Sequence, residues 1–146
     1  MKIYYPYEEF RADLKVLVNK IDQSFDTILP ISRGGLSMGQ MLGEYYNIRR
    51  VYAINTMGYE GSEKLKEVRV WNVPDLDESK EVLVVDDIAD SGETLEQVLS
   101  VLRATYPAVR FWSATIFCKP TSSIEPTWWV KEPQGWIEFF WSEDLL

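Results

Sequence analysis

The amino-acid sequence predicts an α/β protein with a mostly parallel sheet. Apolar runs short enough for strands alternate with segments in which apolar residues recur every three or four positions, the helical period. Val82–Val85 is apolar at every position, which is typical of a strand buried on both faces of a parallel sheet. At 146 residues the chain has the length of one domain, so we expect a single domain over 1–146.

In the first half of the chain, helical spacing predicts a helix over 7–21 and a second one from Leu36 to Tyr45. The apolar run TILPI (27–31) predicts a strand between them, and VYAIN (51–55) predicts the next strand. The stretch 56–66 has two glycines, mixed charges and no period, so a mobile loop is expected there.

In the second half, the sequence 68–73 alternates as a strand can, and the acidic segment 75–81 is expected to be a turn. Val82–Val85 is followed by apolar residues at helical spacing from Leu95 to Leu102, and Phe111–Phe117 predicts another strand. The aromatic tail 128–141 is expected to form short strands.

Composition excludes several classes of function. The chain has no histidine, which removes histidine-based triads and imidazole acid–base chemistry. Its single cysteine, Cys118, cannot form an internal disulfide, which fits a reducing compartment. A net charge of −8 argues against nucleic acid as a partner. No apolar run approaches the roughly 20 residues that span a bilayer, and the acidic N-terminus does not resemble a signal peptide. We therefore expect a cytoplasmic protein with no integral membrane segment.

The segment after the central strand carries the chemistry. Asp86 and Asp87 end the strand, and the turn IADSGET leads into a helix. Ligands of parallel sheets bind beyond the carboxyl ends of the strands, and a small-residue turn at a helix N-terminus can hold a phosphate with backbone N–H groups. The residues of this cradle are Ala89, Ser91, Gly92 and Thr94. Two carboxylates beside it suit ribose hydroxyls and Mg²⁺. Alone, the pattern could also be an acidic strand end with Ser91 capping a helix.

The segment 82–94 resembles the phosphoribosyl-diphosphate motif of type I phosphoribosyltransferases. Its order is four apolar residues, two acids, two spacers, a third acid and then Ser-Gly-x-Thr. SRGGL (32–36), about 50 residues earlier, resembles the pyrophosphate loop of the same family. The resemblance implies that fold, with a core over about 1–120 and a small C-terminal hood over about 121–146 covering the base pocket. It also implies Mg²⁺ as the cofactor.

Residue roles follow from the same resemblance. Asp86 and Asp87 are expected to hold the ribose and, directly or through water, the metal, with Asp87 as the metal ligand. Asp90 is the expected general base. The expected 5′-phosphate site is Ala89, Asp90, Ser91, Gly92, Glu93 and Thr94, although Glu93 stands where Gly is frequent and Ser91 where Thr is. The expected pyrophosphate site is Ser32, Arg33, Gly34, Gly35, Lys64 and Lys66, with Tyr59 a further candidate and Arg33–Gly34 the candidate cis peptide.

The C-terminal third resembles bacterial xanthine-guanine phosphoribosyltransferases and, in its tail, archaeal purine enzymes. The segments that carry this are TIFCKP (115–120) and PQGWIEFFW (133–141). The expected purine-binding residues are Ile88, Lys119, Trp136 and Ile137. A lysine ammonium donates and never accepts, so Lys119 suits a 6-oxo group better than an amino group. Trp128, Trp129 and Trp141 are the alternatives to Trp136 for stacking on the base.

The expected reaction transfers a phosphoribosyl group from phosphoribosyl diphosphate to a 6-oxopurine, in a homodimer or homotetramer. The main alternative is a non-catalytic regulator of the same fold that senses phosphoribosyl diphosphate or a nucleotide. A transferase for a pyrimidine or adenine is a third possibility. Arg33, Asp90, Lys119 and Trp136 together with the acidic composition favour the purine enzyme.

Overall fold

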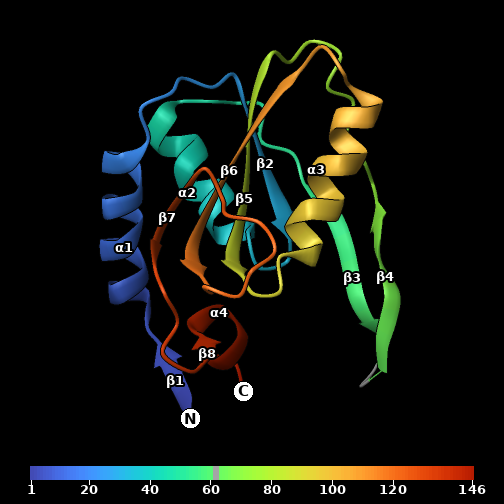
Figure 1. Cartoon of the computed structure of the whole chain (residues 1–146). Helices are drawn as coiled ribbons and strands as arrows, with labels where there is room; N and C mark the ends of the chain where they lie inside the picture. The colour runs from blue at the N-terminus through green and yellow to red at the C-terminus, as the bar shows by residue number, and fades with distance from the viewer. Residues whose placement is uncertain (61–62) are drawn as a thin grey trace.

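A computed structural model describes the backbone of residues 1–60 and 63–146 and the side chains outside 59–66. Six strands form the main sheet in the order β4-β3-β2-β5-β6-β7 (Figure 1). Their bounds are β2 (Thr27–Ser32), β3 (Ile54–Glu60), β4 (Glu63–Trp71), β5 (Glu81–Ala89), β6 (Arg110–Cys118) and β7 (Trp128–Lys131). The edge strand β4 is antiparallel to β3, and the other paired strands of this sheet are parallel. The predicted mostly parallel α/β architecture is confirmed.

Helices cover both faces of the main sheet. Their bounds are α1 (Tyr7–Lys20), α2 (Leu36–Tyr46), α3 (Glu93–Thr105) and the short α4 (Phe140–Glu143). Leu83 and Val85 of β5 pack in one buried cluster with apolar residues of α1 and α2, whereas Val82 and Val84 pack in another with those of α3. Successive side chains of a strand point to opposite faces. This alternation explains why the central strand is apolar at every position.

A mobile loop was expected over 56–66, but residues 56–60 and 63–66 lie in the antiparallel strands β3 and β4, which we call the β3–β4 hairpin; residues 61 and 62 lie outside the described part of the chain. The register of the hairpin shifts between Met57 and Tyr59, where Gly58 interrupts the alternation. The irregularity breaks the alternation of apolar and polar residues by which a strand is recognised in a sequence, and the charged residues of an exposed edge strand weaken that alternation further. The strand expected at 51–55 begins only at Ile54, because Val51 makes a single bridge to Ile28.

A second, two-stranded sheet joins the two ends of the chain. Strand β1 (Lys2–Tyr5), which the sequence did not indicate, pairs in parallel with β8 (Trp136–Phe139). Figure 1 shows both termini beside this small sheet, at the end where β2, β5 and β6 finish. The N-terminus therefore contributes a strand to the region expected as a C-terminal hood, while β7 belongs to the main sheet.

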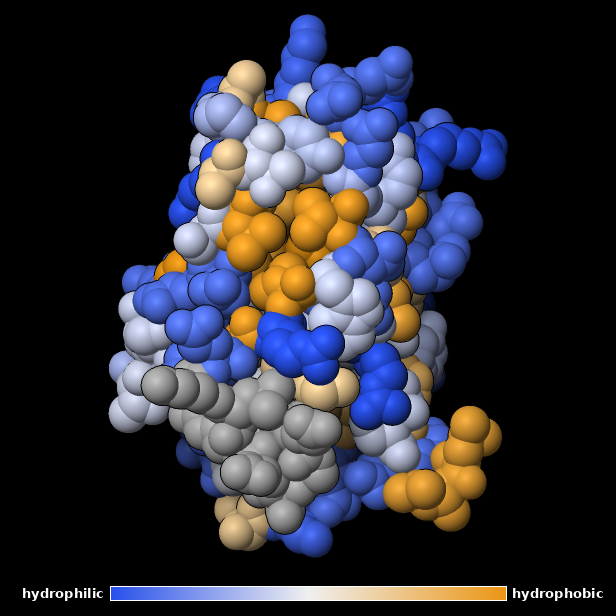
Figure 2. Space-filling model, turned by 90° about the vertical axis from the view of Figure 1, so that its right-hand side faces the viewer, coloured by the Kyte–Doolittle hydropathy of each residue, from blue (hydrophilic) through white to orange (hydrophobic). Residues whose placement is uncertain are grey.

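Figure 2 shows the side of the molecule formed by α3 and the β3–β4 hairpin, where apolar side chains reach the surface between charged ones. Trp71 and Val73, at and just beyond the end of β4, are 41% and 36% exposed. Among the described residues, none of the helices has the length and apolar character that crossing a membrane requires.

Candidate active site

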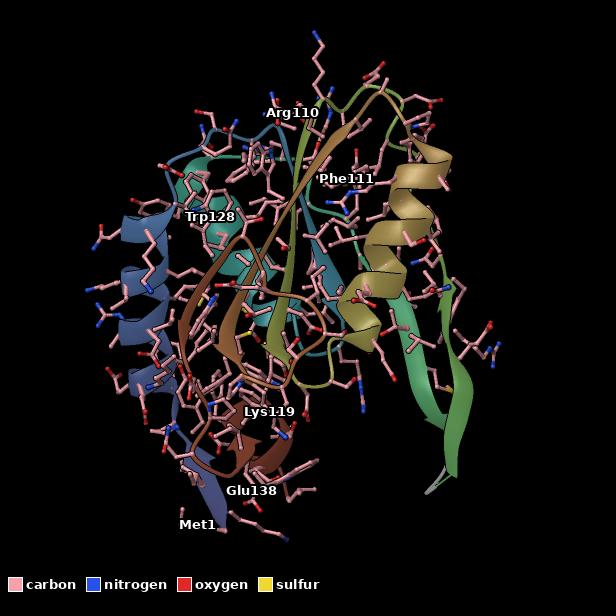
Figure 3. All side chains as sticks on the ribbon, viewed as in Figure 1. Met1, Arg110, Phe111, Lys119, Trp128 and Glu138 are labelled. Atoms are coloured by element: carbon pink, nitrogen blue, oxygen red, sulfur yellow. The ribbon has the colours of Figure 1, made fainter. Side chains whose placement is uncertain are left out.

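Three segments meet at the carboxyl edge of the main sheet. Ser32–Gly35 ends β2 and leads to α2, Asp86–Thr94 ends β5 and begins α3, and Lys119 follows β6. Because β2, β5 and β6 are neighbours and run in the same direction, their carboxyl ends lie side by side. Figure 3 shows Lys119 at this end of β6, near Glu138 of the small sheet, and Arg110 at the opposite end. The topology thus brings together motifs that lie far apart in the sequence.

The two aspartates at the end of β5 are half-buried, and the backbone N–H of Asp87 donates to Asp86 Oδ1 at 2.9 Å. Removal from water raises the pKa of the Asp86 carboxyl well above its usual range, and the neighbouring charge of Asp87 raises it further. Removal from water also raises the pKa of Asp87 to about 6. Two charged carboxylates are therefore costly here unless a cation or hydroxyl donors compensate them.

The loop after β2 packs directly against these aspartates. A methyl group at Gly34 would lie 2.5 Å from Asp87 Oδ2, and one at Gly35 would lie 2.4 Å from the carbonyl oxygen of Val85. At Gly35 the neighbouring atoms are backbone, so a side chain there would require the backbone to shift, whereas at Gly34 the Asp87 carboxylate would have to move. The structure therefore joins the expected pyrophosphate loop to the expected ribose site.

The cis peptide of this loop lies at Ser32–Arg33, not at Arg33–Gly34 as expected from the resemblance. The expectation was one bond too late, because neither residue type nor spacing distinguishes the two peptides beside Arg33. The Arg33 side chain is exposed and forms no ion pair within the part of the chain that the structure describes. Its charge is available to a ligand.

The turn before α3 is held by the segment that follows β6. Gly92 has a positive φ of 89°, and a methyl group there would lie 2.6 Å from the hydroxyl oxygens of Ser122 and Ser123. The backbone N–H of Ser123 donates to the carbonyl of Ser91 at 2.8 Å, and the N–H of Glu93 donates to Ser91 Oγ at 3.2 Å. These contacts fix the expected phosphate cradle at the N-terminus of α3. The two serines were missed by sequence reasoning, because nothing in TSS after a strand predicts this contact.

A cleft of about 1000 Å³ extends from the loop after β2 to the β3–β4 hairpin. The residues that line it are Ser32, Arg33, Gly34, Leu36, Ser37, Asn55, Thr56, Met57, Trp71, Asp87, Trp141 and Ser142. The candidates Tyr59, Lys64 and Lys66 have side chains outside the described residues. Arg33 and Gly34, expected at the pyrophosphate, thus share one cleft with Asp87.

A smaller pocket of about 290 Å³ lies between the end of β6 and the small sheet. It is lined by Ile88, Asp90, Lys119, Gly135, Trp136, Ile137, Glu138, Phe139, Ser142 and Glu143. The four residues expected at the purine are therefore brought together with the expected general base. Ser142 borders both the cleft and the pocket, so the two hollows are neighbours.

Lys119 and Asp90 form an ion pair within the pocket, with 2.7 Å between Nζ and Oδ1. Trp136 is 66% exposed, so its indole ring is accessible from solvent. Of the rivals to Trp136, Trp128 stacks on Trp112, Trp129 donates to Glu125, and Trp141 stacks on Phe139. Trp136 alone among these four tryptophans lines the pocket.

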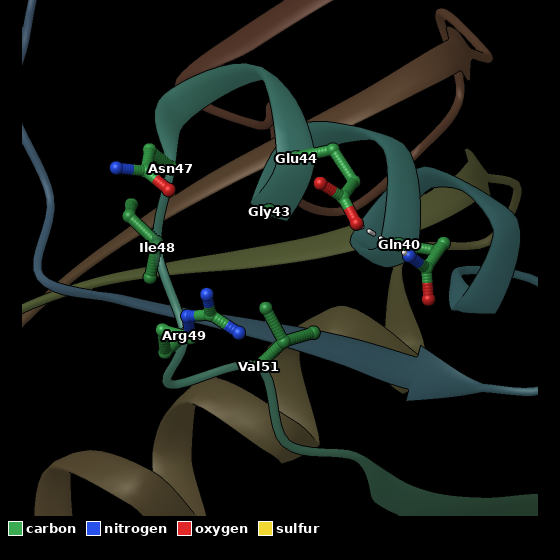
Figure 4. A pocket seen from close by; sticks show the side chains of 7 residues that line it. All are labelled: Gln40, Gly43, Glu44, Asn47, Ile48, Arg49 and Val51. Carbon is green, nitrogen blue, oxygen red and sulfur yellow. Dashed lines mark hydrogen bonds between the residues drawn. The ribbon is translucent and has the colours of Figure 1, made fainter.

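A polar hollow of about 350 Å³ lies at the C-terminal end of α2 (Figure 4). Its lining includes Glu44, Asn47 and Arg49, and Val51 of this hollow bridges Ile28 near the start of β2. It therefore lies at the amino edge of the sheet, away from the carboxyl ends where ligands of such sheets bind.

Comparison with known proteins identifies the family of the chain. The phosphoribosyl transferase domain model matches residues 7–146, and the chain belongs to the phosphoribosyltransferase family. A xanthine-guanine phosphoribosyltransferase from Roseobacter denitrificans is 27% identical over 154 residues, covering 95% of this chain and 84% of that protein.

Solved structures extend the likeness to the whole fold. The Helicobacter pylori xanthine-guanine-hypoxanthine phosphoribosyltransferase superposes with a TM-score of 0.89 at 33% identity, covering 99% of this chain and 96% of that chain. A purine phosphoribosyltransferase from Pyrococcus horikoshii gives a TM-score of 0.80 at 28% identity, with 97% and 94% covered. The expected type I phosphoribosyltransferase fold is confirmed.

Proposed function

We propose that the protein transfers a 5-phosphoribosyl group from phosphoribosyl diphosphate to N9 of a 6-oxopurine and releases pyrophosphate. The close approach of Gly34 to the Asp87 carboxylate carries the proposal, because the loop expected to bind pyrophosphate lies beside an aspartate expected to hold the ribose. The neighbouring pocket with Lys119 and Trp136 supplies a place for the base. The names of the similar enzymes point to the purines xanthine, guanine and hypoxanthine.

The donor would lie along the carboxyl edge of the sheet. Its 5′-phosphate accepts from backbone N–H groups of residues 89–94, and Asp86 and Asp87 accept from the ribose hydroxyls. Its diphosphate accepts from the backbone N–H of Gly34 and pairs with Arg33, which has no ion-pair partner among the described residues. The N–H of Gly35 donates to the carbonyl of Ile31 at 2.9 Å, so Gly35 shapes the loop that approaches the diphosphate. These contacts hold C1′ of the ribose at the boundary between the cleft and the pocket.

The base would enter the pocket with its 6-oxo group toward Lys119 and its face on Trp136. The C1′–oxygen bond to pyrophosphate breaks as the N9–C1′ bond forms, and positive charge develops on the ribose in between. Asp90 takes the proton that the imidazole part of the purine loses, from N7. Ile88 and Ile137 border the base on its apolar sides.

Asp86 and Asp87 fit a magnesium site. Phosphoribosyltransferases generally use Mg²⁺ together with phosphoribosyl diphosphate. Carboxylate oxygens are ligands that Mg²⁺ prefers, and it is commonly held by one or two carboxylates plus substrate phosphates. Among the described residues there is no group of three or more potential metal-ligating side chains. Burial raises the pKa of both carboxyl groups because their charged forms are poorly compensated, and a bound cation would supply that compensation. When bound with the donor, Mg²⁺ would supply positive charge to the leaving pyrophosphate.

Pyrophosphate release tests the proposal. The protein is mixed with phosphoribosyl diphosphate and Mg²⁺, and guanine, xanthine, hypoxanthine and adenine are added in turn. We expect release with at least one 6-oxopurine and none with adenine. Tight binding of phosphoribosyl diphosphate without release for any base would support the sensing regulator instead.

A further inference from the structure

Two asparagines at the base of the β3–β4 hairpin are joined by a side-chain hydrogen bond. Asn55 lies in β3, and Asn72 follows β4 with a left-handed φ of 58°. Asn72 Nδ2 donates to Asn55 Oδ1 at 3.0 Å and approaches the carbonyl oxygen of Ala53 at 3.4 Å. Neither asparagine was identified from the sequence.

This pair assigns the oxygen and the nitrogen of the Asn55 amide. The Ala53 carbonyl can only accept a hydrogen bond, so it requires the NH₂ group of Asn72 on its side. That NH₂ group in turn requires the oxygen of Asn55 as its acceptor. The NH₂ group of Asn55 is therefore left to donate elsewhere.

Asn55 lines the same cleft as Arg33, Gly34 and Asp87. Among the described residues of this lining, Arg33 brings positive charge and Asp87 brings negative charge. An anionic ligand here needs further donors that do not themselves add a carboxylate. An amide with its oxygen already occupied is such a donor.

We propose that Asn55 is a further binding residue for the pyrophosphate group, donating through its side-chain NH₂, and that Asn72 is the positioning residue that holds this amide. The inference rests on the proposed function for the identity of the ligand. The part that does not depend on the transfer reaction is that the hairpin side of the cleft binds a diphosphate through a neutral hydrogen-bond donor.

Asn55→Asp is the discriminating variant. It keeps the shape of the side chain and the oxygen that accepts from Asn72, but it replaces the donor with an anionic oxygen. We expect the affinity for Mg²⁺-pyrophosphate to fall roughly 10- to 100-fold, as for the loss of a hydrogen bond to a charged group. Asn55→Ala should lose less, since it adds no charge. Isothermal titration with Mg²⁺-pyrophosphate measures both.

Guanosine 5′-monophosphate provides the internal control, because it fills the ribose-phosphate and base sites without a diphosphate. Its affinity should be unchanged in Asn55→Asp. Asn72→Gly keeps the left-handed backbone and removes the amide, so it should weaken pyrophosphate binding less than Asn55→Asp does. Wild-type pyrophosphate affinity in Asn55→Asp, or equal losses for both ligands, would overturn the inference. Because binding is measured without turnover, a wild type that binds both ligands but transfers nothing would count against the proposed function alone.

Discussion

Lys119 Nζ lies 2.7 Å from Asp90 Oδ1, so the group expected to recognise the purine is paired with the group expected to deprotonate it. Both side chains are partly exposed, at 39% and 52%, and an ion pair in such a setting contributes little to stability. An incoming base can therefore replace the contact at small cost. The pair holds both groups at the pocket before the base arrives.

Replacing Asp90 by Asn tests its role as the base. The variant keeps the size of the side chain but cannot accept a full proton, so turnover should fall by about 10²- to 10⁴-fold. Binding of phosphoribosyl diphosphate should change little, because its affinity does not depend on this proton transfer. Steady-state kinetics and titration with the donor measure the two effects separately. Near-normal turnover would remove Asp90 from the mechanism.

The pH dependence of stability should reveal the acidic pair. Asp87 has its folded-state pKa raised to about 6, above the unfolded value, so the folded state binds the extra proton more tightly. The contribution of this group to stability therefore falls as the pH rises from about 4 through about 6. In the metal-free protein, Asp87→Asn should be more stable than the wild type at pH 8 by about 3 kcal/mol, and not at pH 4.

Thermal unfolding between pH 4 and pH 8 measures this difference. Asp22→Asn is the matched control, because Asp22 is an exposed acid outside the site, and its stability should follow that of the wild type. Mg²⁺ with pyrophosphate should stabilise the wild type more at pH 8 than at pH 5, since protonation competes with the metal. A wild type that becomes more stable relative to Asp87→Asn as the pH rises would contradict the raised pKa.

The sequence predicted those parts of the candidate site that consist of one continuous segment. Asp86–Thr94 is continuous, and the alternation of β5 into two cores makes its strand recognisable. Contacts between segments far apart in the sequence could not be predicted in this way. Strand β1 has four residues, too few to show a period, and its partner β8 lies at the other end of the chain. The hairpin was mistaken for a loop because Gly58 interrupts its alternation.

Two further features depend on contacts between separate segments of the chain. They are the hydrogen bond between Asn72 and Asn55 and the contacts of Ser122 and Ser123 with Gly92. Each residue type is common in loops, and only the fold brings the partners together. Sequence reasoning therefore found the groups expected to touch the substrates and missed the residues that hold them in place.

Gly34→Ala should impair donor binding through Asp87. The added methyl group would lie 2.5 Å from Asp87 Oδ2, so the carboxylate or the loop must move. A displacement of about 1 Å at a reacting centre can cost about 100-fold, and we expect a loss of that size in kcat/KM for phosphoribosyl diphosphate. A double-mutant cycle with Asp87→Ala provides the check. If the methyl group acts by displacing Asp87, the two effects are strongly non-additive, whereas additive losses would refute the explanation.

Trp136 should contribute through stacking on the purine. Its side chain is 66% exposed, so its removal does little to the core. Stacking on an aromatic side chain is worth about 1–3 kcal/mol per base, so Trp136→Ala should raise KM for the purine roughly 5- to 150-fold. Trp136→Phe should lose less. Trp129→Phe, at a tryptophan that does not line the pocket, should leave KM unchanged. Equal effects at both positions would argue against stacking by Trp136.

A buried polar network should hold the small sheet, and Trp136 with it. The hydroxyl of Tyr5 in β1 donates to Asp13 of α1, and Lys131 of β7 pairs with the same carboxylate at 2.8 Å. Tyr5 is 1% exposed, and its burial and the Asp13 carboxylate raise the pKa of its hydroxyl, which therefore remains a donor. Tyr5→Phe leaves the packing in place and removes one donor from Asp13, at a cost of about 1–3 kcal/mol in unfolding free energy.

Because β1 pairs with β8, loosening Tyr5 should also disturb the purine side of the site more than the donor side. We expect Tyr5→Phe to raise KM for the purine while KM for phosphoribosyl diphosphate stays near the wild-type value. Tyr4→Phe is the matched control: its hydroxyl donates to Asp144 at the surface, where water can replace it, so stability and both KM values should be nearly unchanged. If Tyr5→Phe lost stability but left both KM values unaltered, the network would support folding without positioning the base.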